Sequence, residues 1–181
     1  MTIRVIGGDF GGRRLSTPGG RGTRPTSDRV REAWFSAISD EVVGARVVDL
    51  FAGSGALGIE ALSRGADKAM FVENDRRALN ALRGNVESLG LGERAVVLRS
   101  DVFRAVGGSE LRKANLDIAL ADPPYCVGLA RRLVEVWLER PFAGMLCVEH
   151  SRAELDGLQA DWMRTYGDTE LSFFIGAGRA E

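Results

Sequence analysis

Residues 47–58 read Val-Val-Asp-Leu-Phe-Ala-Gly-Ser-Gly-Ala-Leu-Gly. An apolar, β-branched run leads into glycines spaced as G-x-G-x-x-G, and a helical pattern follows. Gly53 and Gly55 allow the backbone to turn tightly and to approach a ligand, while Gly58 lets a helix pack closely against the strand. This strand–turn–helix order predicts the nucleotide crevice of a Rossmann-like α/β fold.

The chain beyond this motif alternates short apolar runs with helical patterns. Strands are expected at residues 46–52, 69–72, 94–98, 116–121 and 145–150. Helices are expected at residues 56–63, 76–89 and 129–138, and a short, irregular helical stretch before residue 113. Such alternation predicts βαβ units and a mostly parallel sheet. Residues 163–166 and 170–175 flank Gly167-Asp168 and predict an antiparallel hairpin at the sheet edge.

The N-terminal 40 residues have a different character. Residues 3–6 and 13–15 flank a glycine-rich turn and predict a short, basic β-hairpin. A loop follows, and a helix is expected from Ser27 or Asp28 to about Ser39, with Arg29 and Arg31 lying off its apolar face. We therefore divide the chain into a basic extension at residues 1–40 and a main α/β domain at residues 41–181.

Charge is distributed unevenly along the chain. Residues 1–31 carry a net charge of +5, whereas the remainder carries −6. A basic arm on an acidic body is typical of proteins that bind polyanions. The alternative is a flexible arginine-rich terminus without a partner. The candidate phosphate-binding side chains are Arg4, Arg13, Arg14, Arg21, Arg24, Arg29 and Arg31.

Composition limits the classes of protein that fit. The chain is 45% hydrophobic and 27% charged, as is ordinary for a soluble globular domain. It contains no run of eighteen apolar residues and no signal-peptide pattern, so we expect a cytoplasmic protein without a membrane partner. Cys126 and Cys147 have no metal-ligand spacing, and no metal site is expected. Nothing in this short chain predicts an oligomer interface, so we expect a monomer.

Acidic residues follow three consecutive predicted strands. Glu73 lies at the end of the second strand, where its carboxylate could accept hydrogen bonds from ribose hydroxyls. Asp101, just past the third strand, could meet an adenine amine. Asp49, at the mouth of the glycine loop, would repel the pyrophosphate of NAD but would attract the cationic amino-acid end of S-adenosyl-L-methionine. The alternative for Asp49 is a carboxylate that caps the following loop.

A second motif, Asp122-Pro123-Pro124-Tyr125, follows the fourth predicted strand. The two prolines end the strand, because they cannot donate ladder hydrogen bonds. The turn brings together a carboxylate, a backbone carbonyl and an aromatic ring, a set that suits a planar group with an exocyclic amine. The alternative is a proline-stiffened strand exit with a capping aspartate.

These motifs resemble a known class of enzymes. D-L-F-A-G-S-G at residues 49–55, F-V-E-N-D at 71–75 and D-P-P-Y at 122–125 resemble the amino-methylating S-adenosylmethionine-dependent methyltransferases. R-V-I-G-G at 4–8, T-R-P-T-S-D-R-V-R-E-A at 23–33 and Y-G-D-T-E-L-S-F-F at 166–174 are similar to the bacterial 16S rRNA guanine-N2 methyltransferase family, the D-type enzymes that act on small-subunit rRNA.

The resemblance implies a class I methyltransferase fold with an antiparallel C-terminal hairpin and a basic N-terminal extension. It also implies methyl transfer from S-adenosyl-L-methionine to the exocyclic N2 of one guanine of 16S rRNA, of the guanine-966 type, in a 30S particle or assembly intermediate. The catalytic set is then Asp122, Pro123 and Tyr125. The cofactor-binding residues are Asp49, Phe51, Gly53, Gly55, Glu73, Asn74, Asp101 and Val102, and the seven N-terminal arginines would hold RNA phosphates.

Other functions stay open at this point. D-P-P-Y also fits an adenine-N6 DNA methyltransferase or a protein-amide methyltransferase, although the basic extension suits RNA better and no separate target-recognition domain is evident. A non-catalytic rRNA-binding assembly factor is a further alternative. An NAD oxidoreductase fits least, because no general acid or base for hydride transfer lies beside the crevice. His150, the only histidine, is expected to be structural.

Overall fold

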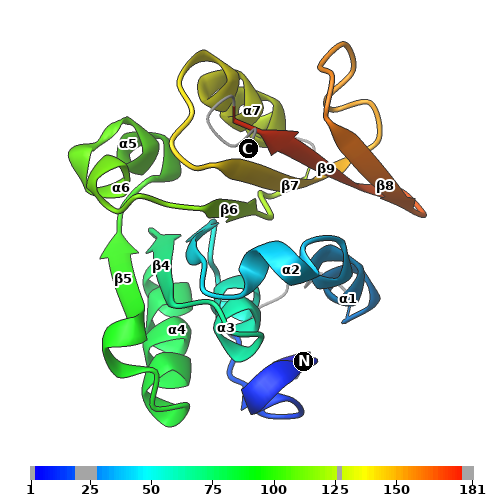
Figure 1. Cartoon of the computed structure of the whole chain (residues 1–181). Coiled ribbons are helices and arrows are strands. Elements are labelled where there is room, and N and C mark those ends of the chain that lie inside the picture. Colours follow the sequence, from blue (N-terminus) through cyan, green and yellow to red (C-terminus); the bar gives the residue numbers. More distant parts are fainter. Residues whose placement is uncertain (1–2, 19–27, 126–127, 177–181) are drawn as a thin grey trace.

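The computed structural model describes residues 3–18, 28–125 and 128–176. These residues form three layers, with helices on both faces of a seven-stranded sheet (Figure 1). The strands lie in the order β5-β4-β3-β6-β7-β9-β8. Their bounds are β3 Arg46–Leu50, β4 Lys68–Glu73, β5 Ala95–Arg99, β6 Ile118–Ala121, β7 Met145–Ser151, β8 Trp162–Tyr166 and β9 Thr169–Ile175.

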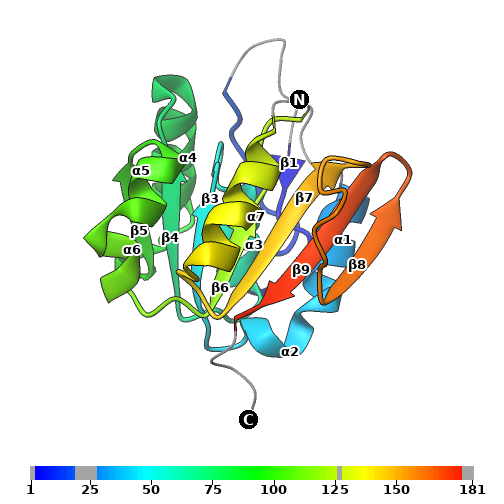
Figure 2. The ribbon, with the colours of Figure 1, turned by 90° about the horizontal axis from the view of Figure 1, so that it is seen from above.

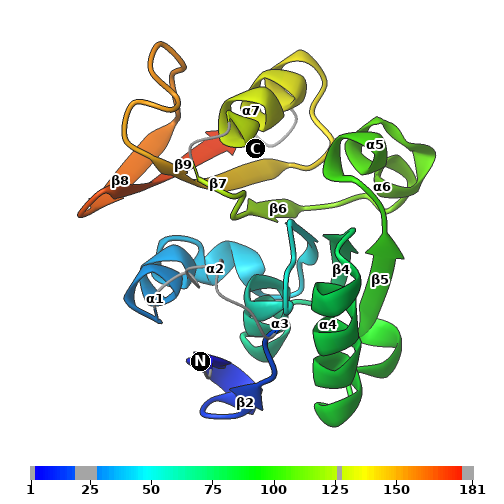
Figure 3. The ribbon, with the colours of Figure 1, turned by 180° about the vertical axis from the view of Figure 1, so that it is seen from behind.

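The helices divide into two groups (Figure 3). One face of the sheet is covered by α1 Asp28–Ala37, α2 Ser39–Val42, α3 Ala56–Ser63 and α4 Arg76–Ser88. The other face is covered by α5 Val102–Gly107, α6 Ser109–Lys113 and α7 Leu129–Glu139. A small antiparallel hairpin of β1 Ile3–Arg4 and β2 Arg14–Leu15, with a 3-10 turn at Gly8–Phe10, lies beside α3. A second 3-10 turn, Gly92–Arg94, precedes β5.

The order of the strands places a switch point between β3 and β6. Strands β3 to β7 are mutually parallel where they pair, and β9 joins β7 and β8 in antiparallel fashion. Figure 2 shows the β9–β8 pair at one edge of the sheet. After β5 the chain returns to the opposite side of β3, so the loops that follow β3 and β6 diverge. Open α/β sheets bind their ligands at such a point, beyond the carboxyl ends of the strands.

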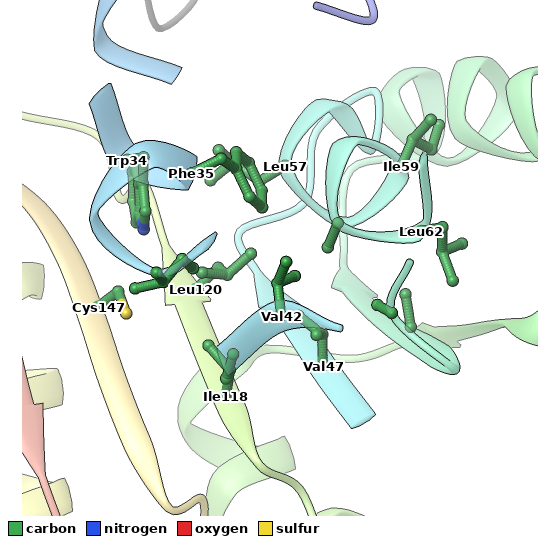
Figure 4. Packing of buried hydrophobic residues seen from close by; sticks show 14 of the residues in the cluster. Trp34, Phe35, Val42, Val47, Leu57, Ile59, Leu62, Ile118, Leu120 and Cys147 are labelled. Carbon is green, nitrogen blue, oxygen red and sulfur yellow. The ribbon is translucent and has the colours of Figure 1, made fainter. Parts of the chain in front are cut away.

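The core continues from the main domain into the N-terminal helices. Trp34 and Phe35 of α1 are fully buried and belong to the same apolar cluster as Val47, Leu57 and Ile118 (Figure 4). Burial of a large apolar side chain stabilises a fold by about 1.5–3 kcal/mol. Helix α1 is therefore part of the main core. The division of the chain at residue 40 stays a prediction, and the packing of α1 shows no break there.

Most expected elements are confirmed, and their ends shift by a few residues. The N-terminal helix is shorter than expected: α1 ends at Ala37, and Ile38, with φ −124° and ψ 29°, separates it from α2. The irregular stretch before residue 113 resolves into α5 and α6. Within the described residues, no helix is long and apolar enough to cross a membrane.

Candidate cofactor and nucleobase site

The carboxyl ends of β3 and β6 form the centre of the candidate site. The loop after β3 has left-handed backbone at Phe51 (φ 61°), Gly53 (φ 56°) and Gly55 (φ 84°). Glycine adopts this conformation at no steric cost, whereas Phe51 is strained, and such strain concentrates at ligand-binding loops. At Gly55 a Cβ would also lie 2.4 Å from Leu82 Cδ1. The predicted tight turn is therefore present, and position 55 requires glycine.

Asp49 is buried at the end of β3, with 1% of its surface exposed. Its Oδ2 accepts a hydrogen bond of 2.8 Å from the Gly58 amide in the first turn of α3. The pKa of Asp49 is raised to about 8, mainly because burial disfavours the ionised form. The Gly58 amide opposes this shift, and nearby Asp122 and Glu73 add to it. Asp49 thus caps α3, and its charge is poorly compensated within the protein.

Glu73 joins the end of β4 to the glycine loop. Its Oε2 accepts from the Gly53 amide at 2.8 Å, and its Oε1 accepts from the amides of Asn74 and Asp75 at 2.7 Å each. A carboxylate offers about four lone-pair directions. Three are used to hold the loop, which leaves room for about one further donor. Glu73 therefore shapes the crevice and is still able to accept from a ligand.

Asp101 and Val102 lie just after β5, which is the third strand of the large sheet in chain order. Asp101 caps α5, and its Oδ1 accepts from the Arg104 amide at 3.0 Å. Its side chain is exposed, whereas Val102 is buried. The two residues are thus presented at the same edge of the sheet as Asp49 and Glu73, because all three strands are parallel.

The Asp122–Tyr125 turn follows β6, the neighbour of β3. Asp122 is half-buried, and it lies close enough to Asp49 and Tyr125 to raise the pKa of each. Tyr125 donates its hydroxyl hydrogen bond to Glu149 of β7, and its Oη lies 3.0 Å from Thr169 Oγ1 of β9. Burial and the bond to Glu149 raise the pKa of Tyr125, so the phenol stays protonated. The aromatic ring of Tyr125 is thus held through its hydroxyl group, and the residue is half-exposed.

Sequence reasoning missed Glu149 and Thr169. Glu149 is 2% exposed and directly follows the apolar run Met145–Val148 of β7, and an acidic residue at a strand end is the one signal that could have revealed it. A buried carboxylate needs hydrogen-bonding partners, and its partner here is 24 residues away in the chain. The two residues fix the position of Tyr125 from strands β7 and β9.

Buried polar side chains join the N-terminal hairpin to this crevice. Glu60 of α3 is fully buried and accepts from two backbone amides of the hairpin, at 2.7 and 2.9 Å. Asn85 of α4 accepts from the Ser16 amide at 2.8 Å and donates to the carbonyl oxygens of Ser16 and Ser54, both at 2.9 Å. Since Ser54 belongs to the glycine loop, the basic extension has a defined position relative to that loop.

The N-terminal arginines do not all lie at the surface. Arg4, Arg13, Arg14 and Arg29 are exposed, as expected for phosphate contacts. Arg31 is 1% exposed, and its Nη2 donates to the Arg4 carbonyl oxygen at 2.7 Å and to Asp28 Oδ1 at 2.8 Å. The structure thus gives no support to the prediction that Arg31 contacts phosphate, because the side chain is packed inside the fold.

Two other N-terminal predictions, for Arg21 and Arg24, lie outside the described residues, as does Cys126. His150 is buried, with Nδ1 2.9 Å from the Ser151 carbonyl oxygen and Nε2 2.8 Å from Ser172 Oγ. Cys147 is a buried free thiol whose pKa is raised by burial. Among residues 3–18, 28–125 and 128–176, no cluster of His, Cys, Asp or Glu could hold a metal ion.

Comparison with known proteins now identifies the family. The family model described as "Conserved hypothetical protein 95" matches residues 3–175. The Bacillus subtilis protein "Putative rRNA methyltransferase YlbH" is 37% identical over 180 residues, which cover 95% of this chain and 98% of that protein. The Escherichia coli K12 protein "Ribosomal RNA small subunit methyltransferase D" is 41% identical over 135 residues, 74% of this chain and 66% of that protein. The chain belongs to the small-subunit rRNA methyltransferase D family.

Solved structures agree with this family assignment. The structure of "Putative methyltransferase yhhF from Escherichia coli" is 31% identical, with a TM-score of 0.81 over 96% of this chain and 97% of that chain. RNA methyltransferases below 25% identity share the fold alone, and they were solved in complex with S-adenosyl-L-homocysteine or with AdoMet and guanosine. The resemblance and the fold class predicted from sequence are confirmed.

Proposed function

We propose that this protein transfers a methyl group from S-adenosyl-L-methionine to the exocyclic N2 of one guanine of 16S rRNA, in a small-subunit particle or assembly intermediate. Its family makes it an rRNA methyltransferase, and S-adenosyl-L-methionine is the cofactor. One observation supports the finer assignment. Asp122, Pro123 and a fixed Tyr125 lie at the switch point, beside the acidic glycine-loop crevice.

The acidic crevice fits this cofactor. Asp49, Glu73 and Asp122 lie near one another, and repulsion by the other two carboxylates adds to burial in raising the pKa of Asp49. A ligand that brings positive charge relieves this repulsion, whereas a pyrophosphate would add to it. Asp49 would then face the cationic end of the cofactor. Glu73 would accept from the ribose with its remaining lone pair, and Phe51, Gly53 and Gly55 would form the adjoining wall.

The strand ends further along the sheet would hold the rest of the cofactor. Asn74 continues from Glu73, and its amide is already ordered by that carboxylate. Asp101 would accept from the adenine amine, and Val102 would contact the ring. When bound, S-adenosyl-L-methionine supplies an electrophilic methyl group, so the protein needs no strong acid or base of its own.

The Asp122–Tyr125 turn would orient the accepting amine. The lone pair of an aryl amine is delocalised into the ring, so the amine is a poor nucleophile until it becomes pyramidal. The Asp122 carboxylate and the Pro123 carbonyl would accept its two hydrogens and so direct the lone pair toward the methyl group. Positioning of this kind can lower a barrier by roughly 7–11 kcal/mol. Asp122 would take up the proton that the nitrogen loses.

Tyr125 would stack on the target base. Removing a base from its helix costs a few kcal/mol, and stacking on an aromatic side chain returns about 1–3 kcal/mol. Because Glu149 and Thr169 hold the phenol, little side-chain entropy is lost when the base enters. Exposed Arg14 and Arg29, with the other surface arginines of the extension, would bind phosphates and fix the register of the RNA.

A methyl-transfer assay with labelled S-adenosyl-L-methionine tests this proposal. The substrates are unmodified small-subunit particles, naked 16S rRNA and duplex DNA, and the labelled nucleoside is identified after digestion. The expected product is N2-methylguanosine from RNA. Label in DNA adenine would favour the N6 alternative, and tight cofactor binding without transfer to any substrate would favour a non-catalytic assembly factor.

A further inference from the structure

A second cleft lies on the α7 face of the sheet, away from the glycine loop. Its volume is about 610 Å³, and it lies between the sheet and the β7–β8 connection, residues 152–161. Figure 1 shows this connection, in orange, on the same side of the sheet as α7. The lining side chains used below are His150, Arg152, Asp156, Met163, Glu170 and Ser172. The proposed methyl transfer uses none of them.

The lining combines a fixed polar floor with apolar walls. His150 is held through both ring nitrogens, one of them by Ser172, and the Oε1 of Glu170 lies 3.4 Å from the Thr165 hydroxyl. Leucines of the connection and Met163, which is 52% exposed, supply apolar surface. The net formal charge of the lining is negative, since it contains one arginine and two carboxylates. A phosphate is therefore disfavoured, and a planar ring with amino groups at its edge is favoured.

The cleft and the candidate target-base site share the carboxyl end of β7. Glu149, which bonds to Tyr125, is followed directly by His150 of the cleft. Thr169, which also contacts Tyr125, is followed by Glu170, and His150 is paired with Glu170 in the β7–β9 ladder. Directly paired residues of antiparallel strands lie about 4.5–5.5 Å apart. The floor of the cleft is thus built from the residues next to those that hold Tyr125. Successive side chains of a strand point to opposite faces, so the cleft lies on the α7 face, and Glu149 and Thr169 point to the other face, near the same carboxyl end of β7.

A further contact joins the outer wall of the cleft to helix α7. Arg131, in the first turn of α7, donates from Nη1 to the Asp156 carbonyl oxygen at 2.9 Å. Helix α7 is the element that follows the Asp122–Tyr125 turn in the chain. An RNA strand that delivers a base to Tyr125 would reach this cleft by passing over the carboxyl end of β7.

We propose that this cleft binds a second unpaired nucleobase of the RNA substrate, close in sequence to the target guanine. The proposal rests on the proposed function, because it assigns a recognition subsite to the same RNA. Proteins read single-stranded RNA by enclosing splayed bases between side chains and hydrogen-bonding their edges. Carboxylates accept from base amino groups, so Glu170 recognises the edge of the base while Met163 packs against its face.

Removal of single bases from the RNA tests the proposal. Small-subunit particles and naked rRNA are prepared with one abasic nucleotide at each position flanking the target. They are assayed with the wild type, with Glu170→Gln, and with Ala160→Trp, which fills the cleft. Glu139→Gln, on the exposed end of α7, is the matched control. Cofactor affinity is measured in parallel for every variant, to detect misfolding.

One flanking abasic position is expected to raise the KM of the wild type for RNA about tenfold, with kcat unchanged. Glu170→Gln and Ala160→Trp should raise KM by a similar factor on intact RNA. On that abasic RNA, the KM of each variant should equal the KM of the wild type. Glu139→Gln should behave as the wild type.

Several outcomes would overturn the proposal. An unchanged KM for both cleft variants would show that the cleft does not bind the RNA. If the effects of a cleft variant and of the abasic position on KM multiplied, the cleft and the base would act independently. A higher KM on particles alone, with no sensitive abasic position, would mean that the cleft contacts a protein of the particle. If the wild type transferred no methyl group to any RNA, the proposed function would itself be wrong, and this proposal with it.

Discussion

The carboxylates of the crevice and the arginines of the N-terminal surface differ in charge and also in how they are held. Asp49 is buried, and Glu73 accepts three backbone amide hydrogen bonds, so the surrounding backbone sets the positions of both carboxylates. Arg14 and Arg29 instead extend into solvent from a short hairpin and from α1.

This difference indicates two kinds of recognition. Fixed charges in a region of low dielectric act strongly on one ligand in one position. Exposed cations attract a polyanion over roughly a Debye length, and they tolerate variation in its geometry. The crevice therefore suits a small cationic cofactor, and the arginine surface suits RNA phosphates. Arg31 is the exception, because it belongs to the basic segment but is held as tightly as a crevice residue.

Arg31→Ala should have the largest effect on stability. The variant removes a long, buried side chain together with its bonds to Asp28 and the Arg4 carbonyl oxygen. We expect the free energy of unfolding to fall by about 2–4 kcal/mol, measured by urea denaturation. Arg29→Ala, the exposed neighbour, should change it by less than about 0.5 kcal/mol. Equal stabilities of the two variants would show that Arg31 belongs to the solvent-facing set.

The affinity for S-adenosyl-L-methionine should depend steeply on pH. The free protein holds a proton on Asp49 below pH 8, because burial raises its pKa to about 8. A cationic ligand favours the ionised form, so binding releases that proton. Affinity should rise roughly tenfold per pH unit up to about pH 8 and then level off. Titration calorimetry in two buffers of different ionisation enthalpy measures the affinity and the number of protons released on binding.

The control variant is Asp49→Asn, which should bind S-adenosyl-L-methionine weakly and lose the pH dependence. An unchanged pH profile of affinity in that variant would exclude Asp49 as the group responsible.

Single exposed arginines should produce the smallest effects. Arg14→Ala and Arg29→Ala should each weaken rRNA binding a few-fold and reduce the slope of log affinity against log salt by about 1. Arg140→Ala, exposed beyond the end of α7, is the matched control and should leave the slope unchanged. Filter binding at four salt concentrations provides the measurement. Equal slopes for all three variants would place the RNA on another surface.

The strand-end carboxylates could be predicted from sequence because a parallel sheet aligns its carboxyl ends at one edge. Asp49, Glu73 and Asp122 each sit at the end of a recognisable apolar run, so their convergence follows from topology alone. The place of the D-P-P-Y turn could be predicted for the same reason. The partners of Tyr125 could not be predicted, because Glu149 and Thr169 lie 24 and 44 positions away from it in the chain.

The burial of Arg31 was missed for a different reason. Arg31, Trp34, Phe35 and Ile38 share the spacing i, i+3, i+4, i+7 and all are buried. The sequence prediction used a different stripe, through Val30 and Trp34, because that face of the helix carries no charged residue. That choice placed Arg31 on the solvent-facing side. Which stripe turns inward depends on the sheet and on the hairpin that supplies the Arg4 carbonyl. The cleft under residues 152–161 likewise has no periodic signal, since a loop forms its outer wall.

The single-turnover rate of methyl transfer by Asp122→Ala, measured together with cofactor affinity, tests the central claim most directly. Asp122 is assigned to the accepting amine, so its loss should lower the rate by roughly 10²–10³-fold, as is typical when one group that stabilises a transition state is removed. The dissociation constant for S-adenosyl-L-methionine should change only a few-fold. A rate close to that of the wild type, or loss of cofactor binding in proportion to the rate, would contradict the account.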